Sequence, residues 1–254
     1  MPSSSIEGGR DIARFRHTKD APMIDFYALT SPNVQKIFIM LEECELPYTM
    51  HPVDVWKGDQ FAPEFTKINP LQKVPAIVDS DGPAGKPYTV IESGAILIYL
   101  AEKTGKFIPH DPLKRYDVIQ WVMVQMANLG PMCGQHVHFS KFSPPGSDYG
   151  IARYRTVVNK LFDVYDQKLA VSPYVAGDEY TIADIAAFPW LRNTDFLGID
   201  ISTRPHVKAW VDKITAREAV KRAYAKIAQI KSVRDSATDD AKDRYFGRGK
   251  YAVA

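Results

Sequence analysis

Cysteine is scarce in this chain of 254 residues, which has only Cys44 and Cys133 and no CxxC pair. Two cysteines cannot form the disulfide framework of a small secreted domain, and free thiols are typical of the reducing cytoplasm. Cys44 shares the apolar side of a predicted helix with Ile37 and Leu41, which favours a position in the core. We therefore predict a cytoplasmic protein without structural disulfides.

Long apolar runs and an excess of charge of one sign are also lacking. No run approaches the ~20 apolar residues of a membrane span, so we expect no membrane association. The formal net charge of +2 is too balanced to indicate nucleic-acid binding. Residues 1–22 are polar and lack the hydrophobic stretch of a secretion signal, so we expect them to form a flexible arm.

The first half of the chain alternates strand patterns with helical ones. Strands are predicted over Ile24–Leu29, Tyr48–Val53, Val74–Asp79 and Tyr88–Ile91. Helices are predicted over Asn33–Glu45, Phe61–Ile68 and Ser93–Thr104. The order β-α-β-α-β-β-α predicts an α/β layer structure with a mixed sheet.

Strand patterns end near Phe107, and the rest of the chain is predicted to be all-helical. Thr181 and Asp184 have the spacing of a capping box before an apolar run. The boundary between the halves falls near residues 106–112, and residues 231–254 are expected to form a loosely held polar tail that can fold back. Further helices are expected over Leu113–Leu129, which Gly130-Pro131 should break, and over Ile151–Leu169, Val207–Ile214 and Ala219–Ile230.

Three short motifs carry candidate chemistry, and the first is Ser31-Pro32-Asn33 at a predicted helix start. A serine before proline is a common helix start, so Ser31 can be a cap with no other role. The same position presents unpaired N–H groups and a partial positive charge, which favour an anion such as a thiolate. Hydrogen bonds from a hydroxyl and a carboxamide would lower the pKa of the thiol further without a general base.

The second motif is Val74-Pro75 and the third is Glu92-Ser93. Proline is tolerated at a strand start on steric grounds alone, and its peptide bond is trans by default. Ser93 can be a helix N-cap and Glu92 a solvated acid. Alternatively, Ser93 and the helix N-terminus hold a carboxylate while Glu92 pairs with an amino group.

Taken together, the order and spacing of these motifs make residues 24–230 resemble the glutathione transferase superfamily, and in detail its Nu class. This bacterial class of disulfide-bond reductase-type enzymes is related to the fungal prion-forming nitrogen regulator. The segments that carry the resemblance are TSPNVQK, WKGDQFAPEF, INPLQKVPAIVD, ESGAILIYLAEKTG, LGPMCGQ and YGIARY.

The resemblance implies an α/β plus all-α fold. A thioredoxin-like glutathione-binding domain over residues 23–106 would contain a mixed four-stranded sheet, and a helical-bundle domain would span residues 112–230. The bond at Pro75 would be cis, so that the backbone of Val74 pairs with the cysteinyl main chain of glutathione. Glu92 and Ser93 would hold the γ-glutamyl group.

In the Nu class a Thr-Pro-Asn triplet replaces the usual catalytic tyrosine, serine or cysteine. The matching residues here make Ser31 and Asn33 the implied catalytic donors. Thr30 takes the hydroxyl role if the loop is shifted by one residue, and this choice stays open.

The resemblance also assigns Gln60, Lys73 and Arg153 to glutathione binding, with Lys73 at the glycyl carboxylate and Arg153 reaching in from the helical domain. One site in this class can hold two glutathione molecules. The class is homodimeric, so a homodimer is implied.

Tyr165 and Tyr224 are candidates for the second-substrate pocket, although tyrosine more often packs in the interior. His136 and His138 have the spacing of a metal pair, but no third ligand is evident and we expect no metal. Four other apolar residues are interpreted as core: Met126, Met132, Trp190 and Phe196.

These features predict glutathione-dependent thiol chemistry. Glutathione would be co-substrate and nucleophile, since no protein cysteine lies at the helix start. The resemblance ranks reduction of disulfides first, and conjugation or cleavage of aromatic thioethers and ethers second. A non-catalytic glutathione-binding regulator is the alternative from another class, because a fold does not fix a function.

Overall fold

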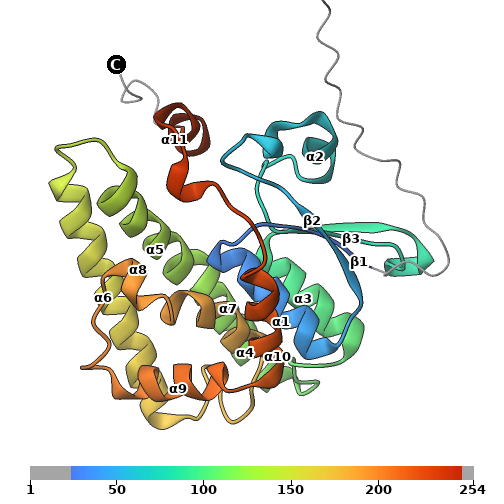
Figure 1. Cartoon of the computed structure of the whole chain (residues 1–254). Helices are drawn as coiled ribbons and strands as arrows, with labels where there is room; N and C mark the ends of the chain where they lie inside the picture. Colours follow the sequence, from blue (N-terminus) through green and yellow to red (C-terminus); the bar gives the residue numbers. More distant parts are fainter. Residues whose placement is uncertain (1–23, 248–254) are drawn as a thin grey trace, which may run out of the picture.

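The computed structural model of the chain describes residues 24–247 (Figure 1). The predicted arm over residues 1–22 and the last part of the predicted tail, 248–254, lie outside the described residues. The N-terminal half contains β1 (Ile24–Ala28), α1 (Pro32–Cys44), β2 (Tyr48–Pro52), α2 (Pro63–Ile68), β3 (Ala76–Asp79), β4 (Tyr88–Ile91) and α3 (Ser93–Thr104). Each predicted element of this half is confirmed, with bounds shifted by at most two residues.

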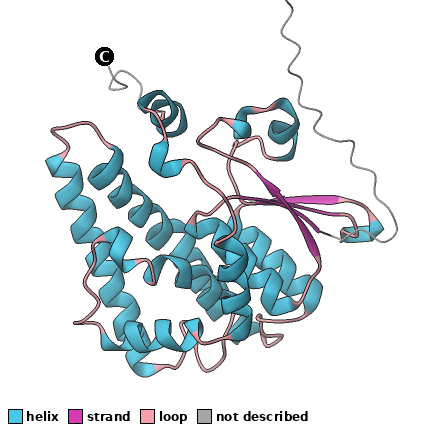
Figure 2. Cartoon of the chain, in the orientation of Figure 1, coloured by secondary structure: helices cyan, strands magenta, loops and turns pink. Residues whose placement is uncertain are grey.

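The described residues form one four-stranded sheet with the order β2-β1-β3-β4 (Figure 2). β1 and β2 are parallel, because α1 returns the chain to the same edge, and the other neighbours are antiparallel. Tyr27 of β1 is opposite Ala76 of β3, which is opposite Ile91 of β4. This register brings the end of β1, the start of β3 and the end of β4 to one edge of the sheet. The predicted mixed sheet is confirmed.

The C-terminal half is helical. Its helices are α4 (Pro112–Val124), α5 (Gly130–Val137), α6 (Asp148–Val171), α7 (Ile182–Leu191), α8 (Thr194–Leu197), α9 (Pro205–Thr215), α10 (Glu218–Ile227) and α11 (Asp239–Phe246). Within this half, α7 packs against α4, α5 and α9.

Gly130-Pro131 does not break the helix that starts at Pro112, so this prediction is wrong. A π-helical turn over Gln125–Leu129 joins α4 to α5, and the Gly130 N–H donates to the carbonyl of Gln125 five residues earlier. The wider turn ends just before Pro131, where the helix can accommodate the missing N–H. The stretch with His136 and His138 is also helical.

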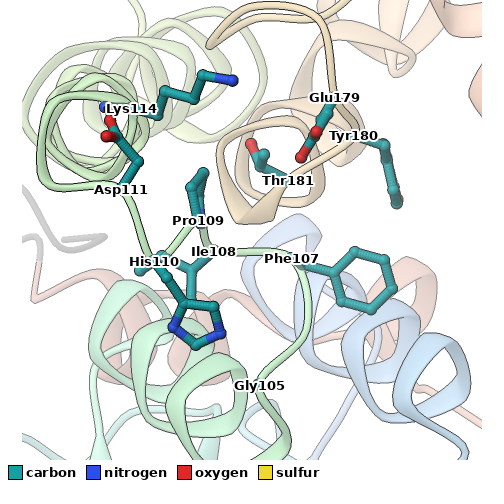
Figure 3. Close-up of a pocket in the computed structure, with 10 residues that line it drawn as sticks. All are labelled: Gly105, Phe107, Ile108, Pro109, His110, Asp111, Lys114, Glu179, Tyr180 and Thr181. Atoms are coloured by element: carbon teal, nitrogen blue, oxygen red, sulfur yellow. Dashed lines mark hydrogen bonds between the residues drawn. The ribbon is translucent and has the colours of Figure 1, made fainter.

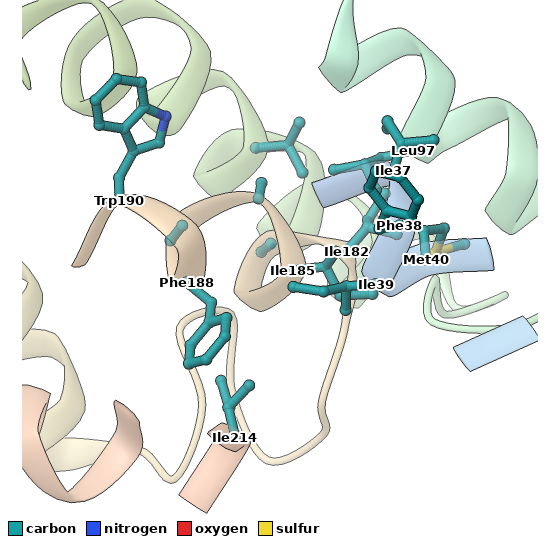
Figure 4. Close-up of a cluster of buried hydrophobic side chains, with 14 of the residues drawn as sticks. Ile37, Phe38, Ile39, Met40, Leu97, Ile182, Ile185, Phe188, Trp190 and Ile214 are labelled. Carbon is teal, nitrogen blue, oxygen red and sulfur yellow. The ribbon is translucent and has the colours of Figure 1, made fainter. Parts of the chain in front are cut away.

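Helix α1 lies between the sheet and the helical half, and its apolar residues are almost fully buried. It packs against α3 on one side and against α7 and α10 on the other. Figure 4 shows Ile39 of α1 beside Ile182 and Ile185 of α7, whereas the Phe38 ring packs against that of Phe26 on β1, with ring centres 4.8 Å apart. One hydrophobic core therefore joins the two halves.

The stretch after α10 turns back over the body of the molecule (Figure 1). The Trp56 ring lies 4.7 Å from that of Tyr245 and 5.9 Å from that of Phe246, both on α11. Phe142 completes the contact, with its ring 4.8 Å from Phe246. The part of the predicted polar tail that the structure describes thus contains an ordered helix with an aromatic contact to the N-terminal half.

Across residues 24–247, no helix is both long enough and apolar enough to span a membrane.

The capping box at the start of α7 is confirmed. The Asp184 carboxylate is fully buried and accepts hydrogen bonds from the N–H groups of Val175 and Thr181 and from the indole of Trp210, at 2.9–3.0 Å. A single carboxylate therefore ties the loop before α7 to α9.

Asp184→Ala should lower the free energy of unfolding by about 3 kcal/mol or more, because several buried donors lose their acceptor. Urea denaturation followed by circular dichroism, at one protein concentration, measures the change. The exposed Asp178→Ala variant is the matched control and should change stability by less than about 0.5 kcal/mol. A loss below about 1 kcal/mol for Asp184→Ala would contradict this role.

Candidate functional site

The sheet edge defined by Tyr27, Ala76 and Ile91 brings the three sequence motifs together. Ser31 follows β1 at the start of α1, Pro75 precedes β3, and Glu92 follows β4. Because of this register, Ser31 and Glu92 lie at the same sheet edge although about sixty positions separate them in the chain. The site is therefore built where two helix N-termini and one strand start meet.

Ser31 is the N-cap residue of α1, but its hydroxyl makes no capping hydrogen bond. The Ser31 carbonyl accepts the first hydrogen bonds of the helix, from the N–H groups of Val34 and Gln35 at 2.9 and 3.0 Å. The interpretation of Ser31 as only a side-chain cap is therefore not supported. Its half-buried hydroxyl remains available to a ligand at the positive end of α1.

Asn33 is oriented by the helical half. The indole N–H of Trp190 on α7 donates to the Asn33 side-chain oxygen at 3.1 Å. Since that oxygen accepts the bond, the NH₂ group of the carboxamide is left as a donor. Trp190, interpreted from sequence as a core residue, is thus in direct contact with a candidate catalytic residue.

Thr30 is held by a relay from α10. The Tyr224 hydroxyl donates to the Gln35 side-chain oxygen at 2.8 Å, and the Gln35 NH₂ donates to the Thr30 carbonyl at 2.9 Å. The Arg192 guanidinium lies 4.1 Å from the centre of the Tyr224 ring. Tyr224 therefore supports the loop that carries Thr30 and Ser31.

The peptide bond between Val74 and Pro75 is cis. The loop that precedes it is fixed by Asn69, whose NH₂ donates to the Lys73 carbonyl at 2.6 Å and whose side-chain oxygen accepts from the Leu71 N–H at 3.0 Å. The Lys73 side chain is exposed. The geometry implied by the family resemblance is present at this position, although sequence statistics alone favoured a trans bond.

Glu92 and Ser93 differ in one detail from the sequence interpretation. Glu92 is the N-cap residue of α3, with φ at 68°, and Ser93 is the first helical residue. A side chain at positive φ is strained, and such strain is concentrated at functional sites. The Ser93 hydroxyl is buried against Met126, whose sulfur lies 3.7 Å away.

Gln60 lies in the loop after β2 and is 2% exposed. Its NH₂ group donates to the Val55 carbonyl at 3.1 Å, whereas its side-chain oxygen has no partner within the described part of the chain. This loop adjoins the end of β1, because the Val53 N–H donates to the Ala28 carbonyl at 3.0 Å. A buried acceptor without a partner beside the candidate site favours a ligand contact.

Two predicted site residues are not brought to this edge. Tyr165 on α6 is fully buried, and its ring packs edge-on against Trp121, with ring centres 5.3 Å apart. Its helix turns this side chain into the core, so the structure does not bring Tyr165 to the candidate site, and its place at a substrate pocket stays a prediction. Arg153 is exposed near the start of α6 and makes no contact with Ser31, Pro75 or Ser93.

Both cysteines are buried away from the helix start. Cys133 has no exposed surface, and burial raises the pKa of its thiol to about 12. Burial also raises the pKa of the Cys44 thiol, which contacts the Thr104 hydroxyl at 3.5 Å. Neither is a ready nucleophile at neutral pH.

The sequence reasoning missed an aromatic cluster around Trp56. Leu29, Val55 and Trp56 pack against Val74, against the π-helical turn His138–Phe142 and against the stretch after α10, through Phe142, Ile230, Val233, Ala237 and Phe246. Trp56 could have been found from the sequence, because it lies in the segment WKGDQF that carries the family resemblance. No sequence pattern marked Tyr245 and Phe246 of the tail as its partners.

A surface pocket of about 380 Å³ lies elsewhere, between the connection from α3 to α4 and the loop before α7 (Figure 3). None of the predicted site residues lines it. The pocket residues are Gly105, Phe107, Ile108, Pro109, His110, Asp111, Lys114, Glu179, Tyr180 and Thr181.

Within residues 24–247, no group of three or more metal-ligating side chains could hold a metal ion.

Comparisons with known proteins identify the family of both halves of the chain. The family model of the glutathione S-transferase N-terminal domain matches residues 30–103, and that of the C-terminal domain matches residues 129–218. The chain is 44% identical over 205 residues to the disulfide-bond oxidoreductase YfcG of Escherichia coli, covering 80% of this chain and 95% of that protein.

Solved structures show the same similarity. A glutathione transferase family member from Pseudomonas fluorescens with two glutathione molecules bound is 41% identical with a TM-score of 0.76, covering 81% of this chain and 94% of that one. Ure2p in complex with S-hexylglutathione is 29% identical with a TM-score of 0.73, and the match covers 80% of this chain and 98% of that one. The chain belongs to the glutathione S-transferase family, among its Nu-like members.

Proposed function

We propose that this protein reduces disulfides with glutathione as both nucleophile and reductant. The observation that carries the proposal is the convergence of Ser31, the cis bond before Pro75 and Ser93 at one sheet edge. It is supported by relatives named disulfide-bond oxidoreductase, YfcG and YghU of Escherichia coli. A similar Pseudomonas putida transferase was solved with one glutathione disulfide bound per subunit.

The proposed reaction has two displacement steps. A glutathione thiolate attacks one sulfur of the substrate disulfide, forms a mixed disulfide and releases the first substrate thiolate. A second glutathione thiolate attacks the glutathione sulfur of that mixed disulfide, forms glutathione disulfide and releases the second substrate thiolate. Two electrons pass from two glutathione molecules to the substrate, and solvent protonates the released thiolates.

The protein contributes donors rather than a base. The N-terminus of α1, the Ser31 hydroxyl and the Asn33 NH₂ would hydrogen-bond the glutathione sulfur, which favours the thiolate. Thr30 is the alternative hydroxyl donor. Because these groups are preformed, a low thiol pKa would need no proton acceptor in the protein.

The rest of glutathione would extend along the sheet edge. The Val74 backbone would pair with the cysteinyl main chain, as in strand addition. Ser93 would hold the γ-glutamyl carboxylate and Glu92 the amino group. Gln60 and Lys73 would contact the remaining part, with Lys73 at the glycyl carboxylate.

A second glutathione molecule and the disulfide substrate would lie on the side facing the helical half. We place them beside Val74, near the cluster of Trp56 and Phe142, with Arg153 as a cation for the second glutathione. Tyr224 would border this region through its support of the Thr30 loop. The aromatic cluster also favours a second candidate function, glutathione conjugation or thioether and ether cleavage on aromatic substrates.

We further propose a cytoplasmic homodimer. Tyr88 on β4, and Tyr116 and Met123 on α4, are large side chains with 46–65% of their surface exposed. Tyr116 and Met123 are seven residues apart and so lie on one face of α4. A C₂ dimer is the commonest closed assembly and would cover this face.

If the chain is a homodimer, light scattering at micromolar concentration should give a mass of twice the 28.6 kDa of the chain. Met123→Glu should shift the protein toward the monomer, because a charge would be buried in the contact. Tyr149→Glu, at a side chain 79% exposed on α6, is the control and should stay dimeric. A monomeric mass for the unaltered chain would reject the dimer.

For the sulfur donor, Ser31→Ala should cut kcat/KM with 2-hydroxyethyl disulfide about ten- to a hundredfold, if the lost bond to a thiolate is worth ~1.5–3 kcal/mol. Thr30→Ala should have little effect. The reverse result would transfer the hydroxyl role to Thr30. If both variants keep full activity, hydroxyl activation is refuted.

For the cysteines, Cys44→Ala and Cys133→Ala should keep the pH–rate profile of the unaltered chain, because the nucleophile is glutathione. Steady-state assays over a range of pH, on variants shown to be folded, provide the measurement. A folded but inactive cysteine variant would make the protein itself the nucleophile.

For the carboxamide, Trp190→Phe keeps the ring but removes the N–H that orients Asn33. We expect kcat to fall about tenfold, in the same direction as Asn33→Ala, with a smaller change in KM for glutathione. The double variant should be no slower than Asn33→Ala alone, since both changes act on one donor. Additive losses would show that Trp190 acts by another route.

A further inference from the structure

Lys36 is a buried charged residue that the proposed mechanism leaves unused. It lies on α1, is 1% exposed, and donates to the Gln125 side-chain oxygen at 2.7 Å and to the Ser93 hydroxyl at 3.3 Å. Both acceptors are neutral, whereas a buried ammonium is normally paired with an anion. These two acceptors satisfy the two N–H groups of a neutral amine, whereas an ammonium would have a third N–H for which the described part of the chain provides no acceptor.

The space around this amino group is built by its neighbours. Gln125 belongs to the π-turn between α4 and α5, has no exposed surface, and its NH₂ group has no partner among the described residues. A Cβ at Gly130 would come within 2.8 Å of that NH₂ group. A Cβ at Gly94 would come within 2.8 Å of Met126. Both glycines therefore keep room for the side chains that enclose Lys36 and Ser93.

Burial and one nearby carboxylate have opposite effects on the pKa of Lys36. Burial lowers the pKa of Lys36 well below its usual value, and the charge of Glu92 opposes this effect. Glu92 is exposed at the mouth of the site. The other ionisable side chains on α3, α7 and α10, the helices packed against α1, bond elsewhere: Tyr99 and Lys103 to Asp79, Glu102 to Arg115, Asp184 to Trp210, Tyr224 to Gln35, Glu218 to Lys221, and Arg222 and Lys226 to Glu42.

We propose that Lys36 is the buried counter-charge of the γ-glutamyl carboxylate, which it positions through Ser93, and that its amine takes up a proton from solvent when this carboxylate binds. This inference rests on the proposed glutathione site. The γ-glutamyl head carries both charges, so Lys36 behind Ser93 and Glu92 in front would form a complementary pair. Lys36 is a positioning residue, since Ser93 separates it from the ligand.

The affinity for the γ-glutamyl group should depend on pH. A bound carboxylate stabilises the ammonium, so the pKa of Lys36 is higher in the complex than in the free protein. Between these two pKa values, binding takes up a proton from solvent. Affinity should therefore fall as pH rises through this range, by up to about tenfold per pH unit, as linkage requires for one proton.

Titration calorimetry with S-methylglutathione tests this directly, because the blocked sulfur removes thiol ionisation from the balance. Binding heats in buffers of different ionisation enthalpy, from about pH 6 to 9, give the number of protons taken up. The unaltered chain should take up more protons than Lys36→Met, in which only the amino group of the ligand, paired with Glu92, can still take up a proton at the upper end of this range. Lys160→Met, an exposed lysine on α6, is the matched control and should behave like the unaltered chain.

A ligand without the carboxylate separates this role from a purely structural one. Lys36→Met should weaken S-methylglutathione binding about ten- to a hundredfold, the scale of a lost interaction with a charged group. The S-methyl derivative of 4-aminobutyryl-cysteinyl-glycine, which lacks only the γ-glutamyl carboxylate, should lose less than about threefold by the same substitution. Equal losses for the two ligands would overturn the proposal.

Gln125→Glu provides a variant whose fold is retained if Lys36→Met does not fold. The new carboxylate would pair with Lys36 at the position of the present acceptor, so the ammonium would exist before the ligand binds. Proton uptake by Lys36 should then disappear and S-methylglutathione should bind more weakly. Unchanged proton uptake in Gln125→Glu would overturn the proposal.

The same calorimetry distinguishes a failure of the proposed function from a failure of the role of Lys36. If the unaltered chain fails to bind S-methylglutathione at millimolar concentration, the proposed function fails and Lys36 has no ligand to position. If the chain binds the ligand without proton uptake that depends on Lys36, the proposed function stands and the role of Lys36 is refuted.

Discussion

The burial of helix α1 between the sheet and the helical half is the constraint on which the rest of the structure depends. Its apolar residues join both halves in one core. The same burial fixes the direction of its N-terminus, which leaves Ser31 at the sheet edge with its hydroxyl unused. Because the helix cannot shift without opening the core, the site at its start is held rigid by hydrophobic packing rather than by bonds within the loop.

Much of the fold was predictable because local patterns and tertiary packing agree. Alternation of apolar residues gave β1 and β4, and the capping box placed the start of α7. The π-turn at Gln125 was not predictable, because Gly130-Pro131 is a breaker in isolation and only the wider turn accommodates it. Tyr165 could not be assigned from spacing, since helical periodicity does not say which neighbour covers a face.

The candidate site was predictable as a set of motifs but not as a set of contacts. Ser31, Pro75 and Ser93 were named from sequence because each sits at an element boundary with a specific residue type. Their meeting depends on strand register, which links Tyr27, Ala76 and Ile91 across the sheet. Contacts such as that of Trp190 with Asn33 join residues 157 positions apart, and no local pattern encodes them.

The distribution of thiols explains why the chemistry belongs to the ligand. Cys44 and Cys133 are buried in apolar surroundings that raise their pKa, so the protein has no reactive sulfur of its own. What it offers instead is a donor-rich helix start beside a backbone edge that can pair with a peptide. In the proposed mechanism such a site would activate a thiol that is delivered in the correct geometry, so recognition of the peptide would be the limiting requirement.

Recognition in turn depends on the helical half, because three residues of the first turns of α1 bond to three different parts of it. Asn33 accepts from Trp190 on α7, Gln35 accepts from Tyr224 on α10, and Lys36 donates to Gln125 in the π-turn. Each bond fixes a different part of the site: the sulfur donor, the loop before it, and the charge behind Ser93. The helical half is therefore part of the candidate site itself. A thioredoxin-like half alone would retain the sheet edge and lose the orientation of all three groups.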